Sequence, residues 1–359
     1  MVPAFHPPRC PKPGCVMFEN PVPGFYKRNG WYRVKNRPEP VQRFKCRACR
    51  RGFSRQTFRV DFRDHKPHLN VLVFSHTAGG VGMRQIARLV LLTRKNLTNK
   101  WHKLGRHLGL QHENLLWDMP ERSSFVFDEL ITYEQDRCTK PVTMPIVVEA
   151  STGFVVTQCA APIRPGGKKS PQCAARIARQ EATEGPRPDR SKAAVTQAFA
   201  VLDSVTQRLP VIRLVTDEKP LYGKLARERF GARLEHVKVS GLLPRIPSNP
   251  LQPINFNELM MRDLLGRLRP DSWLVSKKHG YGQRANWFYA SFRNFVRRRV
   301  NRVRESPAMV LGFTNQRWKP AELLAWRQDW GQSSIYPLSS DGTTLVAHAR
   351  AGQGFVSVA

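Results

Sequence analysis

Acidic residues are scarce in this chain. Its 359 residues include 27 Asp and Glu against 59 Lys and Arg, which gives a formal net charge of +32. A charge of that sign and size attracts polyanions, and a phosphate backbone binds such chains in a salt-dependent, sequence-independent way. We therefore expect a nucleic acid partner; the alternative is a solvated basic surface without function.

Long apolar runs are also missing. No stretch approaches the ~18 to 20 uncharged residues that a membrane-spanning helix requires, and the first residues, Met-Val-Pro-Ala-Phe-His-Pro-Pro-Arg, lack the apolar core of a signal peptide. We therefore expect no membrane partner and a cytoplasmic location. The hydrophobic content of 41% is nevertheless enough for a substantial core.

Cysteine is present in an odd number, seven, so a disulfide framework is not expected. Cys10 with Cys15 and Cys46 with Cys49 form two short-spaced pairs. Two such turns close a tetrahedral four-thiolate site with no open position, which is typical of structural zinc. A segment this small and basic needs zinc to fold, so we predict a zinc ribbon over residues 1–60.

Other potential ligands of this region are less well placed. His65 and His68 are nearby substitutes for a cysteine, but Pro67 between them fits a helix start better. We expect the remaining cysteines to be ordinary thiols: Cys138, Cys159 and Cys173.

Residues 61–118 have the pattern of a helix-turn-helix. One helix presents Leu69, Leu72, Val73 and His76 on one face, and a second repeats Met83, Ile86, Ala87 and Val90. Thr93 is a candidate N-cap for a third helix, with Leu97, Trp101, Leu104 and Leu108 inward. Its other face is basic and predicts contact with DNA; it carries Arg94, Lys95, Asn96, Asn99, Lys100, Lys103 and Arg106. The alternative is a three-helix bundle with a solvated basic face.

From Glu121 onward the pattern changes to strands. Phe125–Ile131, Val142–Ala150 and Phe154–Ala160 are three predicted strands, and a Pro/Gly/Lys-rich stretch over 161–192 is expected to be a flexible insertion. A helix, a strand, a helix and a strand follow. That order is typical of the ribonuclease H topology, a mixed sheet in which the first and fourth strands are neighbours.

Three acids are candidates for a metal site. Asp128 lies in the first predicted strand, Asp217 closes the fourth, and Glu258 follows in a helical pattern. Two carboxylates about 4 Å apart repel by roughly 4 kcal/mol at an effective dielectric near 20, whereas Mg²⁺ takes carboxylate and phosphate oxygens together. Each acid alone is as well explained by its position at the end of an element.

These residues resemble a known family. The chain looks like a DDE transposase of an insertion sequence from about Cys10 to Trp330, most specifically in four segments. These are Phe44-Lys-Cys-Arg-Ala-Cys-Arg-Arg-Gly-Phe-Ser54, Phe127-Asp-Glu-Leu-Ile131, Asn255-Phe-Asn-Glu-Leu-Met-Met-Arg262 with Arg267-Leu-Arg269, and Ser306-Pro-Ala-Met-Val-Leu-Gly312.

The resemblance implies a multidomain enzyme: a zinc ribbon, an all-α helix-turn-helix domain, and an α/β ribonuclease H-like catalytic domain over 119–305, followed by a C-terminal segment and tail over 306–359. It assigns Asp128, Asp217 and Glu258 as Mg²⁺ or Mn²⁺ ligands, with Asn255 and Arg262 in flanking, phosphate-contacting roles. It implies metal-dependent cleavage and strand transfer of DNA, with element ends and target DNA as partners, a homo-oligomer on DNA, and association with the nucleoid.

Two alternatives remain open at this point. A zinc-ribbon/helix-turn-helix repressor, or a catalytically inactive transposase-derived protein, would bind DNA without cutting it. A nuclease of the same fold would cut without joining.

Overall fold

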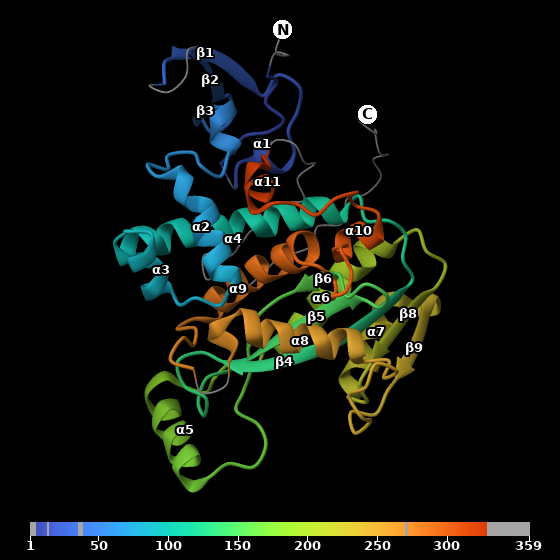
Figure 1. Cartoon of the computed structure of the whole chain (residues 1–359). Coiled ribbons are helices and arrows are strands. Elements are labelled where there is room, and N and C mark those ends of the chain that lie inside the picture. The colour runs from blue at the N-terminus through green and yellow to red at the C-terminus, as the bar shows by residue number, and fades with distance from the viewer. Residues whose placement is uncertain (1–4, 13, 35–38, 270–271, 329–359) are drawn as a thin grey trace.

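The computed structural model describes residues 5–12, 14–34, 39–269 and 272–328. It contains a small antiparallel sheet near the N-terminus, a helical layer, and a larger mixed sheet (Figure 1). Among the described residues, no helix combines the length and apolar character needed to cross a membrane.

The N-terminal sheet has the order β1-β2-β3 and is antiparallel throughout. Its elements are α1 (Val16–Glu19), β1 (Tyr26–Tyr32), β2 (Val41–Cys46), β3 (Gly52–Ser54) and the 3-10 turn Arg55–Phe58. Phe25, Phe44, Phe53 and Phe58 are buried together with three of the cysteines, in a cluster separate from the main core. This core is small, as expected of a segment that relies on a metal staple.

Three helices follow: α2 (Asn70–Ala78), preceded by the 3-10 turn Pro67–Leu69, α3 (Met83–Leu89) and α4 (Arg94–Leu116). Thr93 caps α4, because its hydroxyl accepts a hydrogen bond from the amide of Asn96. All four residues predicted to face inward on α4 are buried. The predicted face of α2 is partly wrong, because Leu72 is 46% exposed while Phe74 and Ala78 are buried.

The larger sheet has the order β6-β5-β4-β8-β9, with β7 paired to β5. Its strands are β4 (Ser124–Tyr133), β5 (Pro141–Glu149), β6 (Val155–Gln158), β7 (Ala161–Pro162), β8 (Ile212–Thr216) and β9 (Leu234–Lys238). β4 is antiparallel to β5 and parallel to β8. The first and fourth predicted strands, β4 and β8, are therefore neighbours, as expected.

Helices cover both faces of this sheet. α6 (Ser191–Thr206) packs on β5 and β6, and α7 (Pro220–Phe230) packs on β9. α8 (Gln252–Leu264) packs on β4 and β5, and α9 (His279–Ser291) on β6 and α4. The remaining short turns are Gly231–Arg233 and Gly266–Leu268.

The 161–192 stretch is not simply an irregular insertion. It contains α5 (Pro171–Glu184), which projects from one end of the molecule and has no buried residue (Figure 1). Its ends are well specified, since Ser170 caps it, Pro171 begins it and Gly185 ends it with positive φ. Strong local signals thus form a helix even without a core to cover.

The chain after α8 folds into short helical segments. α9 ends at Ser291, a π-helical turn covers Phe292–Val296, and α10 (Pro307–Leu311) and α11 (Pro320–Ala325) follow. Arg293 is buried, and its guanidinium donates to the carbonyl of Arg299. Residues 329–359 of the predicted tail lie outside the described residues.

The described C-terminal residues return to the N-terminal sheet. The amide of Gln328 donates to the carbonyl of Phe58, and the guanidinium of Arg327 to that of Arg55. α11 packs against α2 and α4. The two ends of the described chain therefore hold one another over the helical layer (Figure 1).

Candidate metal centres

The four paired cysteines meet in one cluster. Cys10 and Cys15 flank the turn before α1, Cys46 ends β2, and Cys49 lies in the turn to β3. Their sulfurs all lie within 4.8 Å of one another. The cysteines are free thiols, three of them buried.

The spacing of these sulfurs fits zinc. Sγ atoms are 3.5 Å apart between Cys10 and Cys49 and 3.9 Å apart between Cys15 and Cys46. A tetrahedron with zinc–sulfur bonds of ~2.3 Å has sulfur–sulfur edges of roughly 3.8 Å. Four thiolates leave no open position, so a metal bound here would be structural. His65 and His68 are not members of the cluster.

The sheet brings Asp128 and Asp217 together. β4 and β8 are parallel with Val126 level with Val215, so the same register continued by two residues brings Asp128 level with Asp217. Neighbouring strands are about 4.8 Å apart. Asp217 follows the last residue of β8, and its carboxylate accepts a hydrogen bond from the amide of Lys219 at 2.9 Å.

Glu258 comes from α8, which packs over β4. The neighbouring residue Asn257 is fully buried and fixes this helix: its side chain donates to the carbonyl of Gly153 at 3.0 Å, and Tyr289 donates to its Oδ1 at 2.8 Å. Glu258 Oε1 is buried and has no hydrogen-bond partner. A buried carboxylate oxygen without a partner is costly unless a cation binds it.

Burial and neighbouring carboxylates raise the pKa values of two of these acids. Burial, and then the charges of Asp217 and Glu129, raise the pKa of Asp128 from 3.8 to about 6. Burial and the charge of Asp128 raise the pKa of Glu258 from 4.5 to about 7, although Arg262 and Arg245 oppose this. Carboxylates that repel one another in this way suit a divalent cation, which takes oxygen ligands.

The three acids are less tightly gathered than the thiols. Among the described residues, the cysteine cluster is the group whose potential ligand atoms all lie within 4.8 Å. The charge of Asp217 nevertheless raises the pKa of Asp128, and the charge of Asp128 raises that of Glu258, so the three acids share one electrostatic environment. Their donor set fits Mg²⁺ or Mn²⁺ better than zinc, because it consists of carboxylates alone.

Glu129 lies on the opposite face of β4 from Asp128, as the alternation of a strand requires. Its carboxylate accepts hydrogen bonds from Tyr222 at 2.6 Å, Thr143 at 2.7 Å, Ser191 at 3.1 Å and the ammonium of Lys219. Burial alone would raise the pKa of Glu129, but the bonds from Lys219, Tyr222 and Thr143 hold it below its ordinary value.

This network ties the loop after β8 to the sheet. Lys219 bonds both to Asp217, through its amide, and to Glu129, through its ammonium. The sequence did not single out Lys219, Tyr222 or Asn257. The signal available for Asn257 was its position directly before Glu258 in a buried helix.

The flanking polar residues are both partly buried on α8. Arg262 lies one turn after Glu258, and its charge lowers the pKa of that acid. Asn255 has no side-chain hydrogen bond among the described contacts.

The predicted DNA-contacting face of α4 divides into two groups. The side chains of Arg94, Lys95, Asn96, Asn99 and Arg106 are exposed. Lys100 differs from our expectation, because it is buried and donates to the carboxylate of Asp64, the carbonyl of Lys66 and Oδ1 of Asn70. Lys103 donates to the carbonyl of Phe62. The pattern of basic residues along a helix does not predict which lysine ammonium will form hydrogen bonds with a neighbouring loop.

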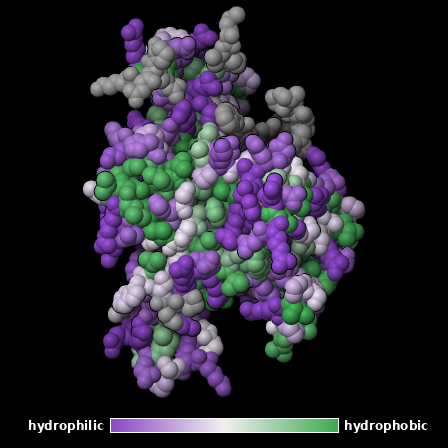
Figure 2. Space-filling view, viewed as in Figure 1, coloured by the Kyte–Doolittle hydropathy of each residue, from purple (hydrophilic) through white to green (hydrophobic). Residues whose placement is uncertain are grey.

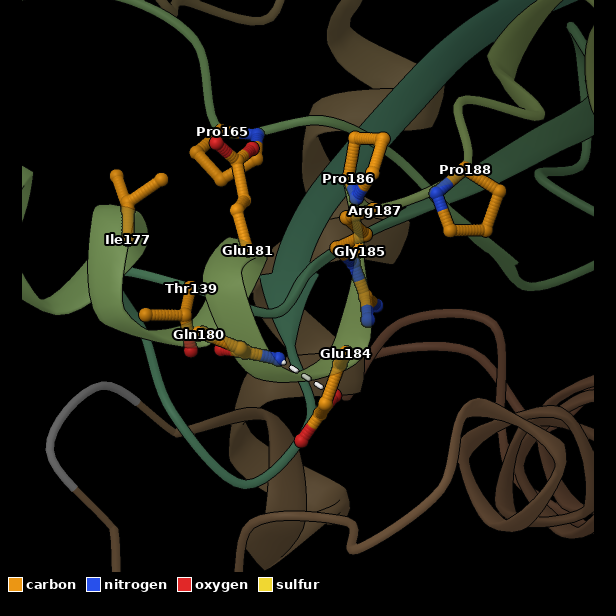
Figure 3. Close-up of a pocket in the computed structure, with 10 residues that line it drawn as sticks. All are labelled: Thr139, Pro165, Ile177, Gln180, Glu181, Glu184, Gly185, Pro186, Arg187 and Pro188. Carbon is orange, nitrogen blue, oxygen red and sulfur yellow. Dashed lines mark hydrogen bonds between the residues drawn. The ribbon is translucent and has the colours of Figure 1, made fainter.

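A separate hollow of about 80 Å³ lies between α5 and the chain that follows it. Its lining includes Ile177, Gln180, Glu184 and Pro186, and Gln180 donates to Glu184 (Figure 3). None of the three acids or four cysteines discussed above lines it, so it is separate from both candidate metal centres.

Comparisons with known proteins add little. Neither the protein-family models nor the curated proteins include a match to this chain. One similar chain belongs to a cryo-EM structure of a simian T-cell lymphotropic virus intasome in complex with PP2A regulatory subunit B56 gamma. It has a TM-score of 0.27 and 10% identity, and the match covers 67% of this chain and 72% of that chain. A TM-score this low supports no conclusion about fold or function.

Proposed function

We propose that this protein is a DNA transposase of an insertion sequence, which binds the element ends and catalyses metal-dependent DNA cleavage and strand transfer. One observation carries the proposal. Two aspartates at adjacent parallel strands and a glutamate on the covering helix form one group of carboxylates, in which the pKa values of Asp128 and Glu258 are raised, in a chain with a net charge of +32.

The strand order and directions support a ribonuclease H-like catalytic domain over 119–305. In this proposal residues 1–60 are a zinc ribbon, 61–118 a helix-turn-helix domain, and 306–359 a C-terminal segment and tail. The partners are DNA ends and target DNA, bound by several copies of the chain at the nucleoid.

Asp128, Asp217 and Glu258 would hold Mg²⁺ or Mn²⁺. Divalent cations bound there would supply Lewis acidity toward a phosphodiester and toward the attacking water or 3′-hydroxyl. Lys219 and Glu129 hold the Asp217 loop in place. Arg262 is positioned to orient Glu258 or to bind a phosphate of the DNA. No protein nucleophile is required.

The first test is cleavage and strand transfer on a duplex that carries an element end, in Mg²⁺. Asp128→Asn and Asp217→Asn should abolish cleavage and leave DNA binding intact, because each removes a ligand charge at nearly constant shape. Glu218→Gln, at an exposed acid in the same loop, is the matched control and should retain activity.

The outcomes separate the alternatives. Substantial cleavage by either aspartate variant would refute the proposed catalytic site. Cleavage without joining by the unaltered protein would identify a nuclease, and end binding without cleavage would identify a repressor or an inactive relative.

Recognition of the ends is assigned to α4. Asn96 and Asn99 are exposed, and Asn pairs bidentately with adenine edges. Asn96→Ala or Asn99→Ala should cost about 1–3 kcal/mol of binding to the correct end and little on scrambled DNA. Titrations on both duplexes test this. Equal losses on the two would show that α4 does not read sequence.

A further inference from the structure

α4 and α9 approach each other unusually closely. A Cβ atom added at Gly105 would lie 3.0 Å from Cβ of Arg284, and one added at Gly109 would lie 3.0 Å from Nε1 of Trp287. These two glycines are four residues apart and therefore share one face of α4. The stem of Arg284, on α9, lies directly against α4 as a result.

This junction collects positive charge. The groups that act on His102 are Arg284, Arg106 and Arg267; together with burial, which is the larger cause, they lower its pKa to about 4. Burial and then Arg106 lower the pKa of Arg284, and burial lowers that of Arg267 to about 10. All the neighbouring charges that affect His102 are thus positive.

The cluster has no carboxylate partner in the described part of the chain. Other half-buried arginines do: Arg187 pairs with Glu134 and Arg233 with Asp203. Arg267 instead donates to Ser276 Oγ at 3.1 Å and lies 4.9 Å from the ring centroid of Trp101. Like charges brought together without an anion destabilise the site.

Two polar atoms at this junction lack partners. Nε of Arg284 and Nδ1 of His102 are both buried and make no hydrogen bond among the described residues. The ring of His102 also packs against that of Tyr281, with centroids 4.6 Å apart. Arg106 is exposed, so the cluster is open to solvent on one side.

We propose that Arg106, Arg284 and His102 form a phosphate-binding site at the α4–α9 junction. A phosphate group offers the negative charge and the several acceptor oxygens that these donors lack, and guanidinium groups bind phosphate through paired hydrogen bonds. The phosphate comes from a DNA backbone or from a free phosphate anion. The DNA source rests on the proposed function, but the site involves none of the proposed metal ligands.

The position of the site gives it a role in orienting DNA. The exposed reading residues lie in the first two turns of α4, and Arg106 lies farther along the same helix. α9 packs on α4 and on the larger sheet. A phosphate bound between α4 and α9 would fix the DNA relative to both the reading helix and the sheet that carries the acids.

The test uses the full chain with inorganic pyrophosphate and with duplex DNA as separate probes. Arg106→Gln and Arg284→Gln are compared with Arg179→Gln, which removes an exposed arginine of α5 that is in no described ion pair. Pyrophosphate should raise the melting temperature of the unaltered protein and of Arg179→Gln. It should not raise the melting temperature of Arg106→Gln or Arg284→Gln.

DNA binding identifies the source of the phosphate. If it is the DNA backbone, each site variant should lower the slope of log K against log salt by about 1, and pyrophosphate should compete with DNA. An unchanged slope, with pyrophosphate binding still lost in the variants, would support the site and identify a free anion as its ligand.

A purely structural role predicts a different pattern. If the cluster only packs the helices, pyrophosphate will not stabilise the unaltered protein, and Arg284→Gln will lower the melting temperature without changing the salt slope. That result would overturn the proposal. Because removing Arg284 relieves like-charge repulsion, we expect Arg284→Gln, in the absence of phosphate, to keep the melting temperature of the unaltered protein. None of these readouts depends on cleavage, so they are separate from the tests of Asp128 and Asp217.

Discussion

The cysteine cluster and the carboxylate site are built in opposite ways. The thiols come from two short segments joined by a small sheet, and their sulfurs are already within 4.8 Å of one another. The acids come from β4, β8 and α8, which meet only when the larger sheet has formed. One centre is assembled by local turns and the other by long-range topology.

The two sites also differ in the type of ligand that they offer and in the core that surrounds them. Four soft thiolates form a closed set that suits structural zinc, and the surrounding core is a few phenylalanines. The carboxylates suit a hard cation with positions left for substrate oxygens, and they rest on the main hydrophobic core of the molecule. Metal at the first centre should therefore maintain the fold, and metal at the second should permit chemistry.

The largest expected effect is loss of the N-terminal module. Chelating zinc, or Cys46→Ser, should unfold the β1–β3 sheet while the larger sheet remains folded, because the small core cannot hold alone. Metal analysis and the near-ultraviolet circular dichroism of the aromatic cluster measure this. Cys173→Ser, outside the cluster, is the control. The prediction would be contradicted if the purified protein contained no zinc, or if the β1–β3 sheet stayed folded in Cys46→Ser.

A smaller effect is expected beneath the carboxylate site. Tyr222→Phe removes one hydrogen bond to the buried Glu129 carboxylate, which should cost about 1.5–3 kcal/mol of unfolding free energy. Denaturant unfolding measures the loss. Tyr133→Phe is the control, since the Tyr133 hydroxyl makes no hydrogen bond among the described contacts. Equal stability of both variants would show that this network does not support the site.

A third effect is a pH dependence of stability that arises from these acids. The pKa values of Asp128 and Glu258 are raised in the folded state to about 6 and about 7. Their contribution to stability is therefore fully present below about pH 4 and is lost as the pH rises through 6 and 7. With zinc retained and no Mg²⁺ or Mn²⁺ added, Asp128→Asn should lose less stability than the unaltered protein between pH 5 and 8, as monitored by thermal unfolding. A parallel decline in both proteins would mean that Asp128 does not titrate in this way.

The same contrast explains what sequence could predict. The cysteine pairs and the Thr93 cap are local patterns, and each is found in the structure. The hydrogen bond from Lys100 to Asp64 depends on how the loop before α2 packs against α4. The helical pattern alone therefore placed Lys100 on the exposed, DNA-contacting face. The burial of Arg293 and the return of Gln328 to Phe58 are equally long-range. α5 was missed because its signals, Ser170 and Gly185, lie in a Pro/Gly-rich stretch that resembles a loop.

The most direct test of the account is Mn²⁺ binding to the zinc-loaded protein, followed by electron paramagnetic resonance of the free ion at pH 7.5. We predict that the unaltered protein and Glu218→Gln bind Mn²⁺, and that Asp128→Asn, Asp217→Asn and Glu258→Gln each weaken this binding at least about tenfold, the equivalent of 1.4 kcal/mol. Equal Mn²⁺ affinity in all five proteins would show that these acids do not form a metal centre, and it would refute the proposed metal-dependent cleavage and strand transfer.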